Sequence, residues 1–560
     1  MATEVHLAPV ERCRVRRGCD LVWSVATIVA VFFVAVILRG VNLERSHMAT
    51  AVDLAPLGKE RGRRRHHRAW SALAIVTIFA VAVILRWVNL DRSWDINVDE
   101  ITYLRLSQSV AESMQVKLYG EPFYIHPPAY FFLQAAYLKL VRPSGYIIEQ
   151  IYSVRHLNVA LAGLSAMALF VLGRSLGGWA AGIAAALIFA VDPFSIRMNS
   201  RAMLDTAAMW WVLLGYSVLV PSLVNARVMP PMRRLVGSGL AFGMALLTKD
   251  MMVFSTIVPL GFAFLFNWSL PRRGAFFVCF VALLTYIPYP FIVALSGDWT
   301  RFELSKLEGM GRLAGLTKIW HQPTLGLGPG SLSFFKALAE NVGWYGTTYV
   351  TSILGAAAVV LLFVRGEPSH RLLAAWAASG YALLAFGIAV GAVEEQFFYY
   401  LAIPALLSAA VAWAHLARAK ELISRRYKAV LMTATMIGVG LIVLSAFMWT
   451  QTHFVPDNGF EELRAFMERS VPIGSRVAVS TDTAEFLMDG YDSGLWGTSV
   501  AQLRAHRAQY VQISTKQVEG GYGVARPPFY AWLVRHAEPV FAFDGRTYGT
   551  LALYRLPPVY

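Results

Sequence analysis

The chain has 560 residues, of which 56% are hydrophobic and 15% charged, and its formal net charge is +15. It is too apolar for a soluble multidomain protein and too charged for one embedded only in lipid, so the composition indicates a membrane body with a polar appendage. Arg and Lys occur in short runs between apolar stretches, which is typical of cytoplasmic membrane loops and argues against a nucleic-acid partner. The three cysteines, Cys13, Cys19 and Cys279, suggest neither a disulfide framework nor a Cys-based metal site.

The first 47 residues (1–47) are a near-copy of the residues that follow them. The apolar stretch 21–46 is echoed by 69–93, and both copies have a basic N-terminal flank, so both would insert in the same direction. The polar stretch 44–68 cannot cross back through lipid between them. We therefore expect that Met48 is the functional start, or that the first copy is a signal-like segment; an extra helix of inverted orientation is the alternative.

Eleven further apolar runs are long enough to cross about 30 Å of hydrocarbon. The basic run 61–68 places the start of the first one inside, and basic residues then alternate with acidic or polar loops down the chain. The sequence thus predicts a polytopic α-helical domain over 48–451 in the plasma membrane. The runs lie near 70–86, 153–173, 177–192, 204–220, 235–248, 252–268, 274–295, 347–364, 371–391, 397–416 and 428–449.

The same alternation places two long loops, 87–152 and 296–346, on the extracytoplasmic face. Residues 452–560 follow on that face with an amphipathic helix, a Pro-Gly turn and alternating short strands. They predict a small α/β domain outside the membrane. It carries no phosphate loop or triad spacing, so we interpret it as a structural or acceptor-presenting module.

The first outer loop opens with an acidic pair, Asp99-Glu100, followed by helix-forming sequence to Met114. Acidic residues at this position are explained by the helix dipole alone, which contributes about 0.3–1 kcal/mol. Other ionisable residues fall at the same membrane face, where such groups are candidates for function. They are His126, Arg155, Arg197, Arg201, Asp205, Lys249 and Asp250.

Taken singly, these residues have simpler explanations. Arg155 and Arg197 fit side chains that extend to the membrane interface or form surface ion pairs. Arg201 and Asp205 are four residues apart and so share one helix face. Together the cations predict an anion site beside a carboxylate.

The order of these elements carries a resemblance. Asp99-Glu100, then GEPFYIHPPAYFFLQAAYLKL, SRAMLDTAAMWW and LAFGMALLTKD, resembles the GT-C superfamily of lipid-carrier-dependent glycosyltransferases over roughly 80–270. More closely, it is similar to the bacterial branch with the aminoarabinose transferase of lipid A and to relatives of the protein O-mannosyltransferases. The segment 395–404, EQFFYYLAIP, is a weaker echo of the family's Tyr-Leu…Pro segment.

The resemblance implies a role for each matching residue. Asp99 matches the catalytic carboxylate, with Glu100 beside it in an open role. His126 stands where many members of the branch have Lys before Pro-Pro, a departure that puts its phosphate contact in doubt. The resemblance implies that the donor-phosphate ligands are Arg201, Lys249, His126 and Arg155. The supporting residues are Asp205, Tyr103, Arg197, Glu395 and Tyr399.

The implied chemistry suits these residue types. A sugar linked through C1 to polyprenyl phosphate has a good leaving group once cations meet the phosphate charge in a dry site. A carboxylate takes the proton of the acceptor hydroxyl as attack develops, and direct displacement inverts the anomeric centre. We expect Asp99 to be this base. We predict no cofactor and no metal, although Asp99-Glu100 could hold a divalent cation through oxygen ligands.

The expected partners are a polyprenyl-phosphate-linked sugar, the lipid bilayer and an acceptor that is a glycan, a lipid or a protein. A secondary transporter is the alternative from another class, but its ionisable residues would lie at the midplane in inverted repeats. A non-catalytic polysaccharide assembly protein is a second alternative, disfavoured by the presence of Asp99, Arg201 and Lys249.

The duplicated segment yields the first testable prediction. If Met48 is the functional start, mass spectrometry of the active protein should find an N-terminus at or after Met48. An intact Met1 in active protein would contradict this version of the hypothesis.

Overall fold

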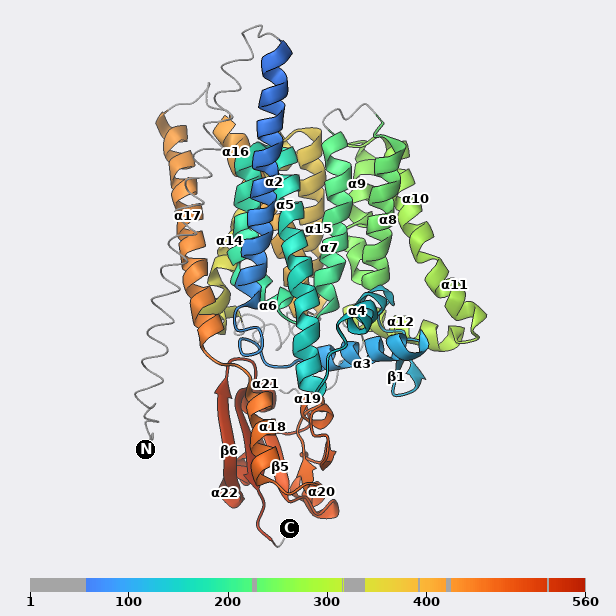
Figure 1. Ribbon diagram of the computed structural model, residues 1–560, viewed down its shortest axis with the longest axis vertical. Coiled ribbons are helices and arrows are strands. Elements are labelled where there is room, and N and C mark those ends of the chain that lie inside the picture. Colours follow the sequence, from blue (N-terminus) through green and yellow to red (C-terminus); the bar gives the residue numbers. More distant parts are fainter. Residues whose placement is uncertain are drawn as a thin grey trace.

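A computed structural model describes residues 57–223, 229–314, 316, 338–390, 393–418, 425–520 and 523–558. The duplicated segment and Met48 lie outside the described residues, as do 317–337 of the second outer loop. A helical bundle forms the body, and shorter helices and a β-sheet project from one end of it (Figure 1). This is the end that the alternation of basic loops predicts to lie outside the membrane.

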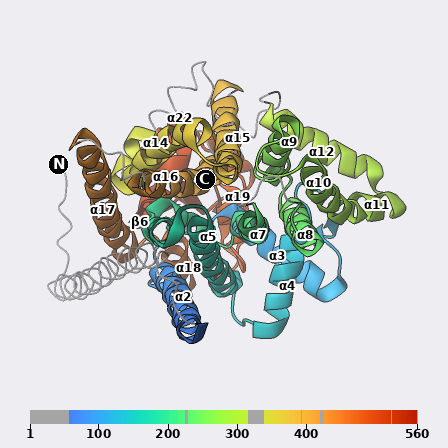
Figure 2. The same cartoon turned by 90° about the horizontal axis from the view of Figure 1, so that it is seen from above.

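The bundle is built from apolar helices whose buried faces form one large core. Seen from above, α17 stands at one edge and α10 and α11 at the other, with α5, α7 and α16 between them (Figure 2). The bounds are α2 (Leu57–Trp87), α5 (Ile147–Val191), α6 (Pro193–Asn199), α7 (Leu204–Leu219), η1 (Val220–Ser222), α8 (Met232–Thr248), η2 (Asp250–Phe254), α9 (Ile257–Phe266), α10 (Arg272–Tyr286), α11 (Pro288–Leu295), α14 (Val342–Arg365), α15 (Pro368–Val390), α16 (Glu395–Arg418) and α17 (Arg425–Phe454).

The described helices include seven that are long and apolar enough to cross a membrane, or eight if α6 and α7, bent by 110°, form one span. The protein is therefore a multi-pass membrane protein, but with fewer full-length helices than the eleven expected. All eleven apolar runs fall in helices. The difference arises because two runs are joined across a break in α5, while α7, α8 and α9 are only 16, 17 and 10 residues long.

Helix α5 joins the predicted runs 153–173 and 177–192 through a kink. Gly178 lies at the kink with φ 76° and ψ −174°. Glycine adopts positive φ without the steric penalty of a Cβ, so the chain can bend here and continue as helix. Arg155 lies near the N-terminal end of α5, and the C-terminal end of α5 leads into α6. Both ends of α5 therefore position residues of the candidate site.

Three helices and a hairpin form the outer layer: α3 (Val98–Ser113), β1 (Lys117–Leu118), β2 (Glu121–Pro122), α4 (Ala129–Val141) and α12 (Trp299–Leu313). Helix α3 lies across the end of the bundle (Figure 1). Its range confirms the helix expected after Asp99. The helix ends at Met114, whose φ of 59° is left-handed.

The C-terminal residues form a five-stranded mixed sheet in the order β4-β3-β5-β7-β6. Strand β3 runs parallel to β4 and β5, whereas β7 is antiparallel to β5 and β6. The α/β character expected for this region is thus present. The elements are α18 (Gly459–Ser470), β3 (Arg476–Ala478), α19 (Asp482–Phe486), β4 (Asp492–Gly494), α20 (Val500–Ala505), β5 (Tyr510–Ser514), α21 (Thr515–Gly520), α22 (Pro527–His536), β6 (Glu538–Gly545) and β7 (Gly549–Arg555).

The sheet and the outer layer share one hydrophobic core. Ile96 and Ile101 of the first outer loop and Ile151 of α5 are buried in the same cluster as Phe460 of α18 and Leu551 of β7. Apolar burial on this scale fixes the two parts relative to each other. The first outer loop, whose helix α3 carries Asp99, is therefore held between the membrane body and the C-terminal sheet.

Close helix packing in the bundle leads to a prediction. A Cβ at Gly355 of α14 would lie 2.6 Å from Ala405 Cβ and 2.9 Å from the Ala405 backbone oxygen on α16, whereas one at Gly438 of α17 would meet nothing within 4 Å. We expect Gly355→Ala to destabilise by about 1–3 kcal/mol through overpacking. Gly438→Ala should be neutral or stabilising by up to about 1 kcal/mol. Thermal unfolding in detergent measures both, and equal transition temperatures would contradict the packing.

Candidate active site

The acidic pair occupies the first turn of α3, whose N-cap is Asn97. Asn97 Oδ1 accepts from the Asp99 backbone N–H at 2.9 Å, and Glu100 Oε2 accepts from the Asn97 N–H at 3.1 Å. This is a complete capping box, in which the two side chains satisfy backbone donors that the helix leaves free. The simple helix-cap explanation therefore holds for Glu100, while the Asp99 side chain remains to be explained.

Glu100 is fully buried and all its bonds are to protein groups. Its Oε1 accepts from Arg155 Nε at 2.9 Å and from the Ala202 backbone N–H at 2.7 Å, and its Oε2 accepts from Arg155 Nη2 at 2.8 Å. Burial acts to raise the pKa of Glu100, but the Arg155 guanidinium, together with the Arg201 charge and the Ala202 N–H, holds it below its usual value. Glu100 is thus an ionised carboxylate that joins three segments of the chain.

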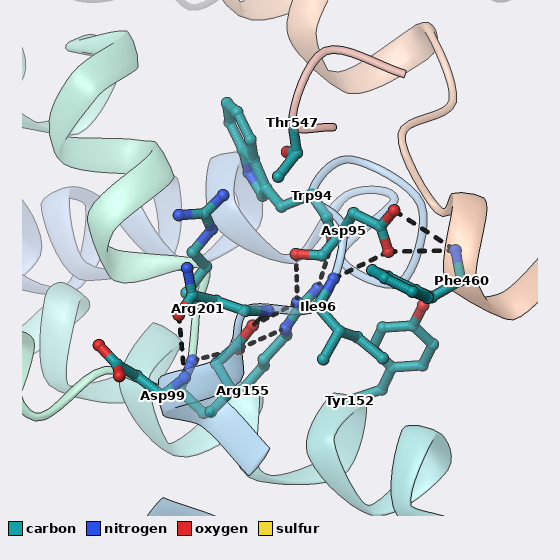
Figure 3. Close-up of polar contacts among 12 residues, drawn as sticks. Trp94, Asp95, Ile96, Asp99, Tyr152, Arg155, Arg201, Phe460 and Thr547 are labelled. Carbon is teal, nitrogen blue, oxygen red and sulfur yellow. Dashed lines mark hydrogen bonds and ion pairs between the residues drawn. The ribbon is translucent and has the colours of Figure 1, made fainter. Parts of the chain in front are cut away.

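Arg155 uses all five of its N–H donors inside this network (Figure 3). Two go to Glu100; Nη1 donates to the carbonyls of Leu90 and Trp94 at 3.1 and 2.8 Å, and Nη2 to that of Asp95 at 3.3 Å. The guanidinium is also fully buried. A phosphate could bind Arg155 only by breaking these bonds, so the geometry favours a positioning role over the expected phosphate contact.

The Asp99 carboxylate is half-buried and has no hydrogen-bond partner within the described ranges. In Figure 3 it carries no dashed line and points away from the Glu100–Arg155 network. Burial raises the pKa of Asp99 to about 6; the Lys249 charge opposes this rise, while Asp205 and Glu394 add to it. A carboxyl that titrates near neutral pH and has its lone pairs free is suited to accept a proton.

Lys249 and Asp205 form a buried ion pair near Asp99. Lys249 Nζ donates to Asp205 Oδ1 at 2.8 Å, and Tyr400 Oη donates to the same oxygen. Lys249 Nζ lies 5.7 Å from the centre of the Tyr400 ring. Asp205 Oδ2 is buried without a partner in the described part of the chain. An ammonium has three donors, so Lys249 keeps two for an anion.

His126 packs against aromatic rings instead of charged partners. Its ring centre lies 5.8 Å from that of Tyr103 and 6.2 Å from that of Phe123. Burial, reinforced by the charges of Lys249 and Lys306, holds the pKa of His126 well below its usual value. The ring is neutral at pH 7, so His126 brings no positive charge to the expected phosphate contact, although a neutral N–H can still donate.

Arg201 and Arg197 lie on a separate side of the site, around Trp94. The Cζ atoms of Arg197, Arg201 and Arg546 lie 5.9, 6.0 and 4.8 Å from the Trp94 ring centre. Arg197 pairs with Glu395 at 2.8 Å, which joins two of the expected supporting residues. Figure 3 shows Arg201 extending toward Trp94. We define Arg197, Arg201 and Arg546 around Trp94 as the arginine cage.

Three residues of the site were not expected from the sequence. Tyr400 bonds to Asp205, while the expected Tyr399 accepts from Asn199 Nδ2 at 2.7 Å, away from Asp205. Glu394, next to Glu395, raises the pKa of Asp99. A helix turns by 100° per residue, so neighbours face different sides and a sequence motif cannot choose between them. Arg546 gave no signal because it comes from the β6–β7 turn of the C-terminal sheet.

No group of three or more His, Cys, Asp or Glu side chains that could hold a metal ion occurs among the residues that the structure describes. The acidic residues around Asp99 are instead matched with cations or protein donors. Glu100, which could have shared a cation with Asp99, is saturated by Arg155, Ala202 and Asn97.

The fold matches solved GT-C glycosyltransferases. The oligosaccharyltransferase AglB of Archaeoglobus fulgidus, in complex with an inhibitory peptide and a dolichol-phosphate, aligns with a TM-score of 0.56 and 12% identity over 87% of this chain and 74% of its own. ArnT of Cupriavidus metallidurans, bound to undecaprenyl phosphate, aligns with a TM-score of 0.53 and 12% identity over 86% of this chain and 97% of its own. No protein-family model and no curated protein matches the sequence. The chain therefore has the GT-C fold. At 12% identity, its likeness to AglB and ArnT shows the fold alone.

The roles of Arg155 and Asp99 are separated by stability measurements. Arg155→Gln should cost about 3–5 kcal/mol, because it leaves the Glu100 charge buried without its partner. Asp99→Asn should change stability by less than about 0.5 kcal/mol, because its carboxylate makes no bond to the described protein. Thermal unfolding of both variants provides the test. A stable Arg155→Gln protein that no longer binds undecaprenyl phosphate would restore the phosphate role.

Proposed function

We propose that the protein is a membrane glycosyltransferase that moves a sugar from a polyprenyl-phosphate donor to an extracytoplasmic acceptor with inversion. The observation that carries the proposal is the Asp99 carboxylate, which is half-buried, without a described partner and titrates near pH 6 beside Lys249. The GT-C fold supports it, since AglB and ArnT were solved with dolichol-phosphate and undecaprenyl phosphate. The acceptor class, glycan, lipid or protein, stays open.

In this mechanism Asp99 acts as general base. The acceptor hydroxyl donates a hydrogen bond to the carboxylate, which takes the proton as the oxygen attacks C1 of the sugar. The C1–oxygen bond to the phosphate breaks, and polyprenyl phosphate leaves from the opposite face. Because one displacement occurs, the anomeric configuration inverts. The step needs no oxidant or co-reactant.

Lys249 is the residue best placed to meet the phosphate charge. It exerts the largest favourable charge effect on Asp99, so it lies near the reacting centre, and Asp205 holds it there through one donor. Its remaining donors and its positive charge would stabilise the departing phosphate in a site with little water. Asp205 and Tyr400 then serve as positioning residues for the Lys249 ammonium.

The site lies at one end of the bundle, which distinguishes it from a transporter. The Asp99 helix crosses the outer end of the helices beside the C-terminal sheet (Figure 1). Carriers place their ionisable groups near the bilayer midplane, between repeats. An assembly protein without catalysis would not need a free carboxylate of raised pKa. We therefore propose that the site lies at the extracytoplasmic face of the plasma membrane and that it catalyses a reaction.

Replacing Asp99 tests the function even when the acceptor is unknown. A strain lacking the protein should accumulate its polyprenyl-phosphate sugar, which mass spectrometry identifies directly. Wild type should clear the accumulated donor, whereas Asp99→Asn should slow its consumption by at least about 10²-fold, the usual contribution of a general base. Asp91→Asn is the matched control, since Asp91 is an exposed carboxylate of the same loop. Donor clearance by Asp99→Asn at the wild-type rate would rule out the mechanism.

The pH dependence gives an independent check. The active form of Asp99 is the carboxylate, and its pKa is raised to about 6, so protonation removes the base below that pH. With donor extracted from the deletion strain, kcat/KM should fall about tenfold per pH unit below pH 6 and level off above it. A profile that stays flat from pH 5 to pH 8 would contradict Asp99 as the titrating base.

A further inference from the structure

The arginine cage gathers three cations from three separate parts of the chain. Arg197 comes from α6, Arg201 from the turn before α7, and Arg546 from the β6–β7 turn of the C-terminal sheet. Arg546 also lies over the Trp344 ring at 5.2 Å, and its Nη2 donates to the Ser93 carbonyl at 2.5 Å. The cage therefore lies at the contact between the C-terminal sheet and the membrane body.

The charges in the cage are not balanced by the described protein. Arg197 pairs with Glu395 at 2.8 Å, and Arg546 lies 3.9 Å from Asp457. Arg201 has no ion-pair partner among the residues that the structure describes, although its side chain is only 3% exposed. Three guanidinium groups thus face two carboxylates. An unpaired buried charge is unfavourable unless a ligand of opposite charge meets it.

The hydrogen-bond donors of the cage are also incompletely used. Five buried nitrogens have no partner in the part of the chain that the structure describes. They are Arg197 Nε, Arg201 Nε and Nη2, and Arg546 Nε and Nη1. Buried guanidinium donors normally meet carboxylate or phosphate oxygens, often in pairs. An oxyanion would therefore balance the excess positive charge of the cage and also accept from its unused N–H donors.

We propose that the arginine cage binds an oxyanion, a phosphate or carboxylate group, that the acceptor carries, so that the C-terminal sheet is part of the acceptor site. This proposal rests on the proposed function. Asp99 and Lys249 occupy a different cluster, in which Lys249 keeps two donors for the donor phosphate.

The position of Arg546 favours the acceptor over the donor as the source of the anion. The donor lipid reaches the site from the bilayer, whereas Arg546 projects from a sheet that lies beyond the end of the bundle (Figure 1). An occupant that contacts Arg546 therefore faces the aqueous side. Arg201 links the two clusters, because the adjacent Ala202 N–H is bonded to Glu100 beside Asp99. A bound anion would hold an acidic acceptor next to the base.

Inorganic phosphate probes the cage without knowledge of the acceptor. In the full-length protein in detergent, phosphate at ten times its Kd should raise the apparent Tm by about 2–4 °C relative to chloride at equal ionic strength. Arg546→Gln should weaken phosphate binding by roughly 10-fold or more, because it removes a charged donor. Arg535→Gln, at an exposed arginine of the same sheet domain, should behave as wild type. Equal stabilisation of Arg546→Gln and wild type by phosphate would overturn the proposal.

A second arm distinguishes the two sources of the anion. Undecaprenyl phosphate should bind wild type and Arg546→Gln with equal affinity. Inorganic phosphate at the concentration that just saturates the Arg546-dependent site should not displace it from the wild type, because the apolar tail gives the lipid an affinity that free phosphate lacks. Displacement, or loss of undecaprenyl phosphate binding in Arg546→Gln, would assign the cage to the donor and overturn the acceptor proposal. The displacement test uses only wild-type protein and so holds even if the variant fails to fold. Wild type that binds phosphate but no undecaprenyl phosphate would count against the proposed function instead.

Discussion

The buried pair of Glu100 and Arg155 is the interaction on which the rest of the site depends. Glu100 holds the start of α3 and the turn before α7, and Arg155 holds the carbonyls of the loop that follows α2. Desolvating two charges is costly, and here every donor of Arg155 is matched by an acceptor. The pair therefore acts as a rigid joint between three segments, and it fixes the directions of Asp99, Trp94 and Arg201.

This joint separates two acids that are neighbours in sequence. Glu100 is ionised and fully bonded, so it cannot accept a proton without releasing Arg155. Asp99 lies one residue earlier on the helix, turned away from the joint, where burial raises its pKa. Glu100 thus keeps Asp99, the proposed base, in place, while Lys249 limits the rise in the Asp99 pKa. A base that titrates near working pH requires this balance between burial and an opposing charge.

The sequence predicted the parts of this arrangement that local patterns determine. The start of α3 followed from its acidic first turn, and Lys249 and Asp205, both expected at one membrane face, form an ion pair, whereas Arg201, expected to share a helix face with Asp205, lies in the turn before α7. Patterns could not show that Arg155 is saturated, because its partners are backbone carbonyls of Leu90, Trp94 and Asp95, which no side-chain motif encodes. Likewise, window hydropathy detected apolar runs but not where helices break, so eleven runs became seven or eight full-length spans.

The position of Arg546 could not be predicted from any local pattern, because it depends on how two regions that are distant in the sequence pack together. The Asp457 N–H donates to the Arg92 carbonyl at 2.7 Å, Tyr548 Oη donates to the Ile96 carbonyl at 2.6 Å, and a common apolar core surrounds them. These contacts tie the sheet to the same loop that carries Trp94 and Asp99. Because that loop is held by Arg155 on one side and by the sheet on the other, the sheet and the membrane body cannot shift relative to each other without moving Asp99. The C-terminal sheet is therefore a wall of the candidate site, and its β6–β7 turn brings Arg546 to the same Trp94 that Arg197 and Arg201 approach from the membrane helices.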